Sequence, residues 1–297
     1  MDPEGATGEM ANSNRLKDET RIFKEDKIMV VQHNLKAMNS NRMLGLTSAA
    51  QAKSTEKLSS GYKVNRAADD ASGLAMSEKM RRQVRGLTQA SANAQDGISM
   101  VQTAEGALNE VHDMLQRINE LAVKGENGTL TSSDRSYINS EVKQLMSEID
   151  RVASTTTFNE KNLLTGSCAT VDLQVGAETN QHIQLKIEKM SCSGINLSGS
   201  VSSATTAGAL NTSVKAAIAK VNQQRSDLGS VQNRLEHTIN NLDNVIENTT
   251  AAESQIRDTD MATEMVKFSN NNILQQAGQS MLAQANQSNQ GVLSLLG

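Results

Sequence analysis

The sequence has very few aromatic residues, no tryptophan and a single proline, Pro3. Because the 297 residues include only three Phe and two Tyr, a core must be built from Ala, Leu, Ile, Val and the 14 Met. These side chains suit long packed helices. Proline is the strongest helix breaker, so its absence from the rest of the chain permits helices far longer than the usual length of about 11–12 residues. This composition argues against an enzyme.

The chain also lacks a strong charge of one sign and the usual metal and redox motifs. It carries 29 basic and 33 acidic residues, which argues against general binding to nucleic acid or to an anionic membrane. No apolar run approaches about 18 residues, and the first residues lack the apolar segment of a cleavable secretion signal. Cys168 and Cys192 form no CxxC motif, and the four histidines form no HExxH motif. We therefore expect no metal, no cofactor and no membrane insertion.

Apolar residues recur at steps of three and four over residues 76–124, which predicts one long helix with a coiled-coil seam. It is expected to begin around residue 71, where Asp69 and Asp70 suit the positive end of the helix dipole. Gly125 and Gly128 are expected to end it, since glycine tolerates a left-handed cap.

Two further helices are predicted by the same spacing. One opens with Thr131 and Asp134 in capping-box spacing and should lie antiparallel to the first. The other is expected to begin near Val214, after a Ser/Thr/Gly/Ala-rich segment, 198–213, that is typical of an exposed loop.

Between Cys168 and Cys192 the apolar spacing changes to two, which predicts one β-hairpin with position 171 opposite position 187. The two cysteines flank this hairpin, so a disulfide between them is geometrically feasible. The same register leaves the cysteines offset by two residues, and two free thiols are the alternative.

Both ends of the periodic region have polar faces almost without charge. Residues 268–297 contain no charged side chain, and residues 29–55 contain no acidic one. Burying an unpaired charge is very costly, whereas amides and hydroxyls can hydrogen-bond across an interface. The pattern therefore favours helices enclosed by copies of the same chain over a disordered polar tail. The apolar residues expected to mediate polymerisation are Leu274, Met281, Leu282, Val292, Leu293, Leu295 and Leu296.

Four long motifs resemble the bacterial flagellins. They are KLSSGYKVNRAADDASGLAMSEKM (57–80), GLTQASANAQDGISMVQTAEGALNEVHDMLQRINELAV (86–123), SEIDRVASTTTFNEKNLL (147–164) and NNILQQAGQSMLAQANQSNQGVLSLLG (271–297). With the weaker stretches between them, the resemblance covers about 29–166 and 214–297.

The resemblance and the periodicity together predict a mainly α fold: a long antiparallel helical rod with one β-hairpin and paired terminal helices. The expected divisions are a terminal-helix core domain (29–68 and 258–297), a rod domain (69–166 and 214–257) and a hairpin with a short exposed Ser/Thr-rich loop (167–213). This is a short form without large outer domains. Residues 1–28 are expected to be a disordered extension or a mis-assigned start, with Met29 as the alternative first residue.

The resemblance implies a filament subunit for swimming motility that is exported by the flagellar type III apparatus to the cell exterior. The implied partners are copies of itself, an export chaperone that binds the C-terminal helix, and the filament cap and hook-junction proteins. A hook–filament junction protein and a secreted coiled-coil effector or adhesin are the alternatives. The Ser/Thr cluster at 200–206 is an implied site of O-glycosylation.

The resemblance also implies binding to the host Toll-like receptor for flagellin. The matching residues here are Gln116, Arg117, Leu121 and Glu141. Arg117 and Leu121 are four residues apart and so lie on one helix face. The alternative is that Leu121 packs within the chain and Arg117 pairs with a neighbouring acid.

Overall fold

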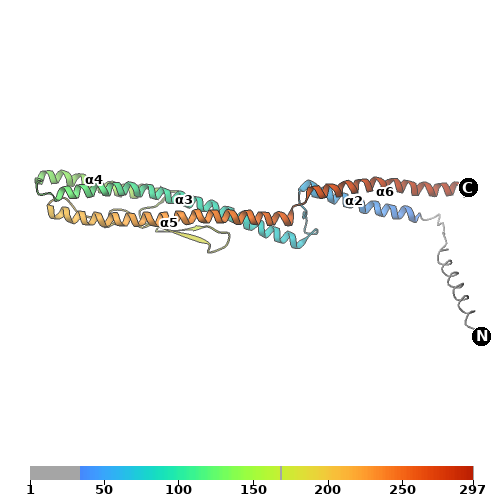
Figure 1. Ribbon diagram of the computed structural model, residues 1–297, viewed down its shortest axis with the longest axis horizontal. Coiled ribbons are helices and arrows are strands. Elements are labelled where there is room, and N and C mark those ends of the chain that lie inside the picture. Colours follow the sequence, from blue (N-terminus) through green and yellow to red (C-terminus); the bar gives the residue numbers. More distant parts are fainter. Residues whose placement is uncertain (1–33, 168, 297) are drawn as a thin grey trace, which may run out of the picture. The chain divides into compact units, whose positions relative to one another are not determined.

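The computed structural model describes residues 34–167 and 169–296, and side chains as far as residue 288. The helices are α2 (Leu35–Ser60), α3 (Ala71–Glu126), α4 (Ser132–Thr155), α5 (Ala204–Arg257) and α6 (Met261–Leu296) (Figure 1). The strands are β1 (Thr157–Phe158), β2 (Lys161–Asn162), β3 (Thr170–Gln174) and β4 (His182–Lys186). The predicted mainly α class is confirmed. The expected extension 1–28 lies outside the described residues.

The chain forms two compact units, which are described separately. The central unit comprises Arg66–Asp258, and the terminal unit comprises the described residues before and after it. In the central unit α3 packs along α5 and α4 packs against α3, while in the terminal unit α2 pairs with α6. Within the described residues no helix is long and apolar enough to cross a membrane.

The predicted seam of α3 is the core of the central unit. Its apolar residues at alternating steps of three and four are fully buried against α4 and α5: Val101, Ala104, Leu108, Val111, Leu115, Ile118 and Ala122. Side chains at this spacing share one helix face, so a single stripe contacts both neighbouring helices.

The start of α3 is capped as the sequence predicts. Asp70 is the N-cap residue, and its carboxylate accepts hydrogen bonds from the backbone N–H groups of Ser72 and Gly73. Asp69 accepts from the backbone N–H of Arg66, which closes the turn that leads into the helix. Such caps satisfy N–H groups that have no partner within the helix.

Helix α3 ends close to the predicted glycines, but not by the left-handed glycine cap that the sequence predicts. The cap residue is Asn127 in an extended conformation (φ −64°, ψ 128°), and neither Gly125 nor Gly128 adopts a left-handed conformation. Gly125 is required for packing instead, because a Cβ there would collide with the side chain of Val201. The terminal carbonyls are satisfied by Arg135, whose guanidinium donates to the carbonyls of Gly125 and Asn127 at 3.2 and 2.9 Å.

The capping box of α4 is confirmed, with reciprocal bonds between Thr131 and Asp134. The start of α5 is wrong, because this helix begins at Ala204 rather than near Val214. Ser203 and Thr206 form a second capping box there. The helix includes the second half of the small-residue segment because two apolar side chains there, Ala207 and Leu210, are buried in the core.

The predicted hairpin is present, but its register differs by two residues. Val171 lies opposite Leu185 rather than opposite residue 187. The turn is two residues shorter than the predicted register requires, because the Val175 N–H donates to the Gln181 carbonyl, and alternation still buries Leu185 on the core face. The two-residue ladder β1–β2 was not predicted. Its turn places Asn159 and Glu160 at φ +47° and +64°, and Asn is the only sequence signal for it.

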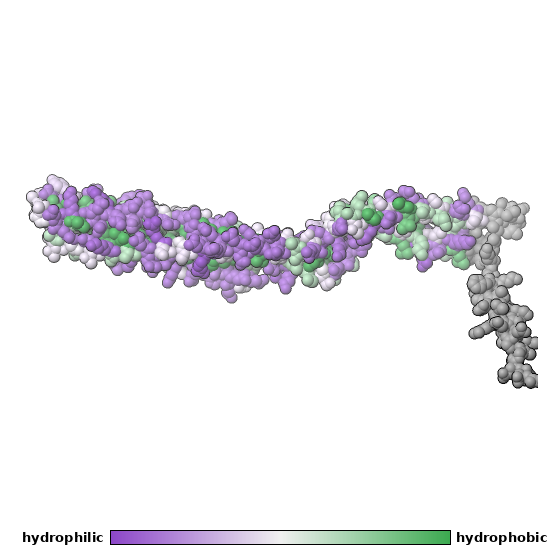
Figure 2. Space-filling model, in the orientation of Figure 1, coloured by the Kyte–Doolittle hydropathy of each residue, from purple (hydrophilic) through white to green (hydrophobic). Residues whose placement is uncertain are grey.

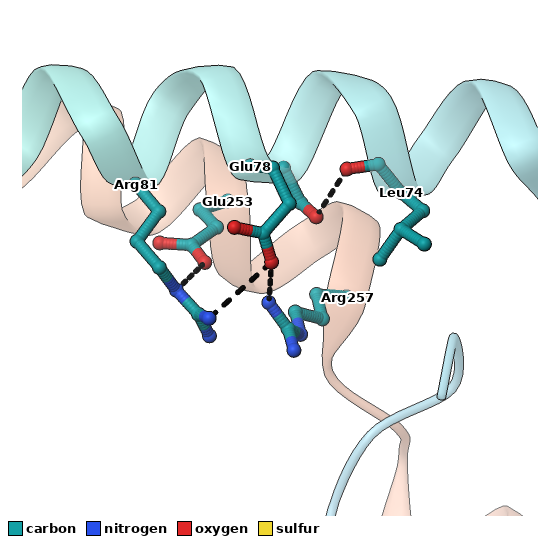
Figure 3. Close-up of polar contacts among 6 residues, drawn as sticks. Leu74, Glu78, Arg81, Glu253 and Arg257 are labelled. Atoms are coloured by element: carbon teal, nitrogen blue, oxygen red, sulfur yellow. Dashed lines mark hydrogen bonds and ion pairs between the residues drawn. The ribbon is translucent and has the colours of Figure 1, made fainter. Parts of the chain in front are cut away.

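Ion pairs link the start of α3 to the end of α5 (Figure 3). Arg257 and Arg81 both contact the carboxylate of Glu78, at 3.0 and 3.3 Å, and Arg81 also lies 3.4 Å from Glu253. The deeply buried apolar core does not reach this end of α3 and α5. The ion pairs therefore add to a contact that has little apolar burial. Because these groups are partly exposed, each pair contributes modestly.

The terminal unit is an antiparallel helix pair with almost no apolar core. The side-chain amide of Asn34 donates to the Ala285 carbonyl at 3.0 Å, and Gly61 ends α2 with φ +76°. Among the described residues of this unit, the buried side chains are Ser54, Val64 and Glu264. Two of these three are polar, so the pair does not resemble the packed seam of the central unit.

Candidate functional site

Exposed apolar side chains concentrate on the terminal unit. Figure 2 shows hydrophobic patches over α2 and α6, whereas the visible face of the central unit is mostly hydrophilic. We call the large exposed apolar residues of these two helices the assembly surface: Leu35, Met38, Met43, Leu46, Met261, Met265, Val266, Ile273, Leu274 and Met281. Large apolar side chains exposed in such number are typical of an interaction surface.

The predicted polymerisation residues fall partly on this surface. Leu274 is 56% exposed and Met281 is 63% exposed, while Leu282 is half-buried. The side chains of the other four residues lie outside the described part of α6: Val292, Leu293, Leu295 and Leu296. The apolar residues of α2 were not named from the sequence, although its shortage of charge was the signal that could have found them.

Charge in the terminal unit gathers around one carboxylate. Glu264 accepts a 2.7 Å hydrogen bond from the Ser54 hydroxyl, and the Lys267 ammonium lies 3.3 Å from its other oxygen. The Ser54 hydrogen bond, followed by that from Lys267, lowers the pKa of Glu264. Beyond Lys267 the polar contacts of α6 are neutral, such as the bond from Gln276 to Asn272 at 3.3 Å. Most of α6 therefore presents no charge that would oppose burial.

The predicted receptor residues meet at the contact between α3 and α4. The Nε and Nη2 atoms of Arg117 donate to one oxygen of Glu141 at 3.0 and 2.9 Å, and Nη1 donates to Glu120 at 3.0 Å. These bonds, led by that to Glu141, raise the pKa of Arg117. Gln116 is exposed nearby on α3, whereas Leu121 is only 3% exposed and belongs to the core. The alternative packing, with Leu121 inside the chain and Arg117 paired, is thus the one adopted.

Two residues near the Arg117–Glu141 pair were not singled out from the sequence. Glu120 lies one turn from Arg117 and shares its guanidinium. Tyr137 lies one turn before Glu141 on α4 and is highly exposed. Exposed aromatic residues are frequent interface anchors.

Cys192 follows the hairpin in the sequence, and its thiol is buried. Its backbone N–H donates to Asp150 at 2.8 Å, and its Sγ lies 3.2 Å from the Met146 carbonyl. Burial, with the negative charge of Asp150, raises the pKa of this thiol to about 12. Cys168 lies outside the described residues, so the disulfide stays a prediction. Within the described ranges, no group of three or more His, Cys, Asp or Glu residues could hold a metal ion.

These features define a class of protein: a long helical protein with a pair of helices whose apolar side chains its own fold leaves uncovered. Comparison with known proteins identifies its family. A family model of the bacterial flagellin N-terminal helical region matches residues 31–169, and one of the bacterial flagellin C-terminal helical region matches residues 212–296. The chain belongs to the bacterial flagellin family.

Similar proteins span nearly the whole chain. A flagellin of Halalkalibacterium halodurans is 52% identical over 271 residues, covering 90% of this chain and 100% of that protein. The flagellar filament 31.3 kDa core protein of Treponema maltophilum is 50% identical and the flagellin of Bacillus subtilis is 46% identical, with the same coverage. A crystal structure of Bacillus cereus flagellin is 29% identical and has a TM-score of 0.48, covering 51% of this chain and 88% of that one.

Membership of this family, at such identity, gives the chain the role of a flagellar filament subunit and does not favour the junction-protein or effector alternatives.

Proposed function

We propose that copies of this chain assemble into the filament through the assembly surface of α2 and α6. The expected core domain (29–68 and 258–297) would lie at the centre of the filament, with the rod domain (69–166 and 214–257) outside it. The observation that carries this proposal is the exposure of Leu274 and Met281 on a helix with no charge after Lys267. A solvated surface helix would carry charged residues opposite its apolar stripe.

The energetics of the terminal unit support folding coupled to assembly. Its helices span 26 and 36 residues, and ordering each residue costs about 1–2 kcal/mol. Burial inside the unit offsets little of this cost, because its few buried side chains are mostly polar. Contact with neighbouring copies would supply the missing apolar burial, at roughly 25 cal/mol per Å² of apolar area.

Seeded polymerisation tests the proposal. Purified chain starting at Met29 is mixed with short filament fragments and followed by negative-stain microscopy, beside a truncation that lacks residues 268–297. Long uniform filaments are expected from the full chain and none from the truncation. Circular dichroism of the truncation is the control, since α3, α4 and α5 belong to the central unit and should remain helical. Filaments from the truncated chain would refute the proposed role of α6.

The exposed apolar residues of α6 also support a role for an export chaperone. Before assembly, the seam that includes Leu274, Met281 and Leu282 would be covered by the chaperone, and the subunit would leave the cell through the type III apparatus unfolded. The filament cap and hook-junction proteins would contact the ends of the resulting polymer outside the cell. Isothermal titration of the chaperone with the full chain and with the truncation lacking 268–297 tests this, because equal affinities would exclude α6 as the binding segment.

We further propose that the host Toll-like receptor for flagellin binds the face formed by Gln116, Arg117 and Glu141. Two hydrogen bonds from Arg117 to Glu141 fix the guanidinium before binding, which lowers the entropy lost on association. Leu121 is buried and would act by holding α3 in place rather than by touching the receptor.

A binding titration with Arg117→Ala and Glu141→Ala tests the receptor proposal. The chain offers a matched control in Arg151, an exposed arginine on α4 that pairs with Glu148. Arg117→Ala and Glu141→Ala should weaken binding at least tenfold, as interface anchors do, while Arg151→Ala should leave it unchanged. Equal affinity for all variants would refute the proposal.

A further inference from the structure

The contact between α2 and α6 contains one long-range polar bond between buried side chains. The Ser54 hydroxyl on α2 donates to Glu264 on α6 at 2.7 Å, and each residue is only 5% exposed. Further along the pair the helices also approach closely at a small residue. A Cβ built on Gly278, for example, would lie 3.3 Å from Cδ1 of Leu44.

The other contacts of the pair fix the register of the two helices less sharply. The Asn34 amide, for example, donates to the main-chain carbonyl of Ala285, and main-chain carbonyls recur along the whole of α6. Apolar attraction has no direction, and the neutral amides of α6 can hydrogen-bond at several offsets. On α6, Leu274, Gly278 and Leu282 follow one another at steps of four and so form one row on the helix surface. A shift of one turn, about 5.4 Å, would therefore place Leu274 or Leu282 opposite Leu44 in place of Gly278. The larger side chain would push the helices apart at this point, but the contact would stay apolar.

The Ser54–Glu264 bond does not tolerate such a shift. The helices are antiparallel, so a slip of one turn would move Glu264 from Ser54 to a position opposite Ala50 or Leu58, which offer no side-chain donor. Lys267 would not correct the error, because it lies on the same helix as Glu264 and moves with it. The ammonium groups of Lys53 and Lys57 on α2 line the same pocket as Glu264 and would stay near it after a slip. They are carried on long flexible side chains, so they do not select one alignment as the short Ser54 hydroxyl does. A buried carboxylate without its hydrogen bond is strongly disfavoured.

We propose that the Ser54–Glu264 hydrogen bond sets the register of α2 against α6. The two residues are then positioning residues for filament assembly, an inference that rests on the proposed role of this helix pair. The apolar residues supply the driving force for association, and this bond between two buried side chains selects the alignment in which they associate. A single buried polar pair can fix the register of paired helices in this way.

Disulfide mapping in filaments tests the proposal. In a Cys168→Ser, Cys192→Ser background, Leu44→Cys is combined in separate chains with Gly278→Cys, Leu274→Cys or Leu282→Cys. The first combination reports the register of the structure, and the other two report a slip of one turn in either direction. Each is oxidised after assembly, and intrachain linkage is measured by mass spectrometry of digests.

The register is then perturbed in four ways. Ser54→Ala removes the donor, and the double variant Ser54→Ala, Glu264→Leu removes both polar groups without leaving a buried charge. Glu264→Gln keeps an oxygen that can accept from Ser54. Ser48→Ala, at an exposed serine of the same helix, is the matched control.

The unmodified background and the Ser48→Ala and Glu264→Gln variants should form at least tenfold more of the 44–278 linkage than of either slipped linkage. The double variant should assemble and give a mixture in which slipped linkages rise to a comparable yield. Ser54→Ala should either give the same mixture or fail to assemble because it leaves a buried carboxylate unpaired. An unchanged 44–278 preference in the double variant, or its failure to assemble, would overturn the proposal. Failure of the unmodified background to assemble would instead count against the assembly surface itself.

Discussion

Met281→Ala offers a direct measure of how much the assembly surface contributes to polymerisation. Met281 is 63% exposed in the isolated chain, and full burial of a methionine side chain stabilises by about 1.5–3 kcal/mol. Burying the exposed part against a neighbouring copy is therefore worth about 1–2 kcal/mol. Loss of this contribution should raise the critical concentration for elongation roughly 5- to 30-fold, since each 1.4 kcal/mol is tenfold in an equilibrium constant.

The assay is sedimentation of filaments grown from fixed seeds, with the soluble subunit concentration measured at steady state. Met76 provides the matched control, because it is a methionine on a helix of the central unit with a similar exposure of 52%. Met76→Ala should change the critical concentration by less than about twofold, as an exposed substitution outside an interface does. Equal effects of the two substitutions, or no effect of Met281→Ala, would refute the argument that uncovered apolar side chains of the terminal unit drive assembly.

Three further predictions concern packing, pH and capping. Gly125→Ala should lower the free energy of unfolding of the central unit by about 1–3 kcal/mol, because the new methyl group enters occupied space. Gly229→Ala is the control, since it meets open space in α5 and should be neutral or slightly stabilising; urea denaturation of monomers measures both. Folding lowers the pKa of Glu264 below its ordinary value of 4.5, chiefly through the Ser54 hydrogen bond, so the unfolded chain binds the proton more tightly. The stabilisation by ionised Glu264 is therefore complete above about pH 4.5 and is lost as the pH falls through the lower pKa of the folded state. Filaments of Glu264→Gln should show a weaker pH dependence of the melting temperature over that interval. Thr131→Ala should cost about 0.5–2 kcal/mol of stability, measured by thermal melting, because α4 loses its capping box.

The sequence predicted most reliably the features that depend on local or periodic patterns. The α3 seam could be identified because residues such as Leu108 and Leu115 recur at the spacing that places them on one face. The α4 cap was predictable because Thr131 and Asp134 are three residues apart and their capping bonds are made to each other. In such cases the neighbours that determine the structure are adjacent in the sequence.

The predictions that were wrong depend on contacts between distant residues. Gly125 appeared to be a helix terminator, but its partner Val201 is far away in the chain and no local pattern reveals the contact. The beginning of α5 was missed because Ser, Thr and Gly dominate the segment locally. Leu210 and Val214 continue the apolar spacing, but only the core that they contact turns this weak signal into a helix.

The candidate site was predicted in kind but not in detail. Absence of charge after Lys267 indicated an enclosed α6, because that inference needs only composition and the cost of burying charge. The burial of Leu121 was left open, because a residue four positions from Arg117 lies on the same broad face yet can be rotated far enough to enter the core. The Ser54–Glu264 bond was not foreseen, since a serine and a glutamate in separate helices carry no pattern that pairs them.

In the terminal unit, the apolar contacts and the Ser54–Glu264 hydrogen bond have different physical consequences for a polymer. A subunit that joined with α2 and α6 shifted by one turn would keep most of its apolar burial, so the assembly surface alone penalises the error weakly. The same subunit would present its exposed residues about 5.4 Å out of place to the next copy. In a polymer of identical units each such error is passed to several neighbours, so even a small population of slipped subunits would limit filament length. A short hydrogen bond to a buried carboxylate penalises the shift steeply, because its energy depends on distance over less than an ångström whereas apolar burial does not.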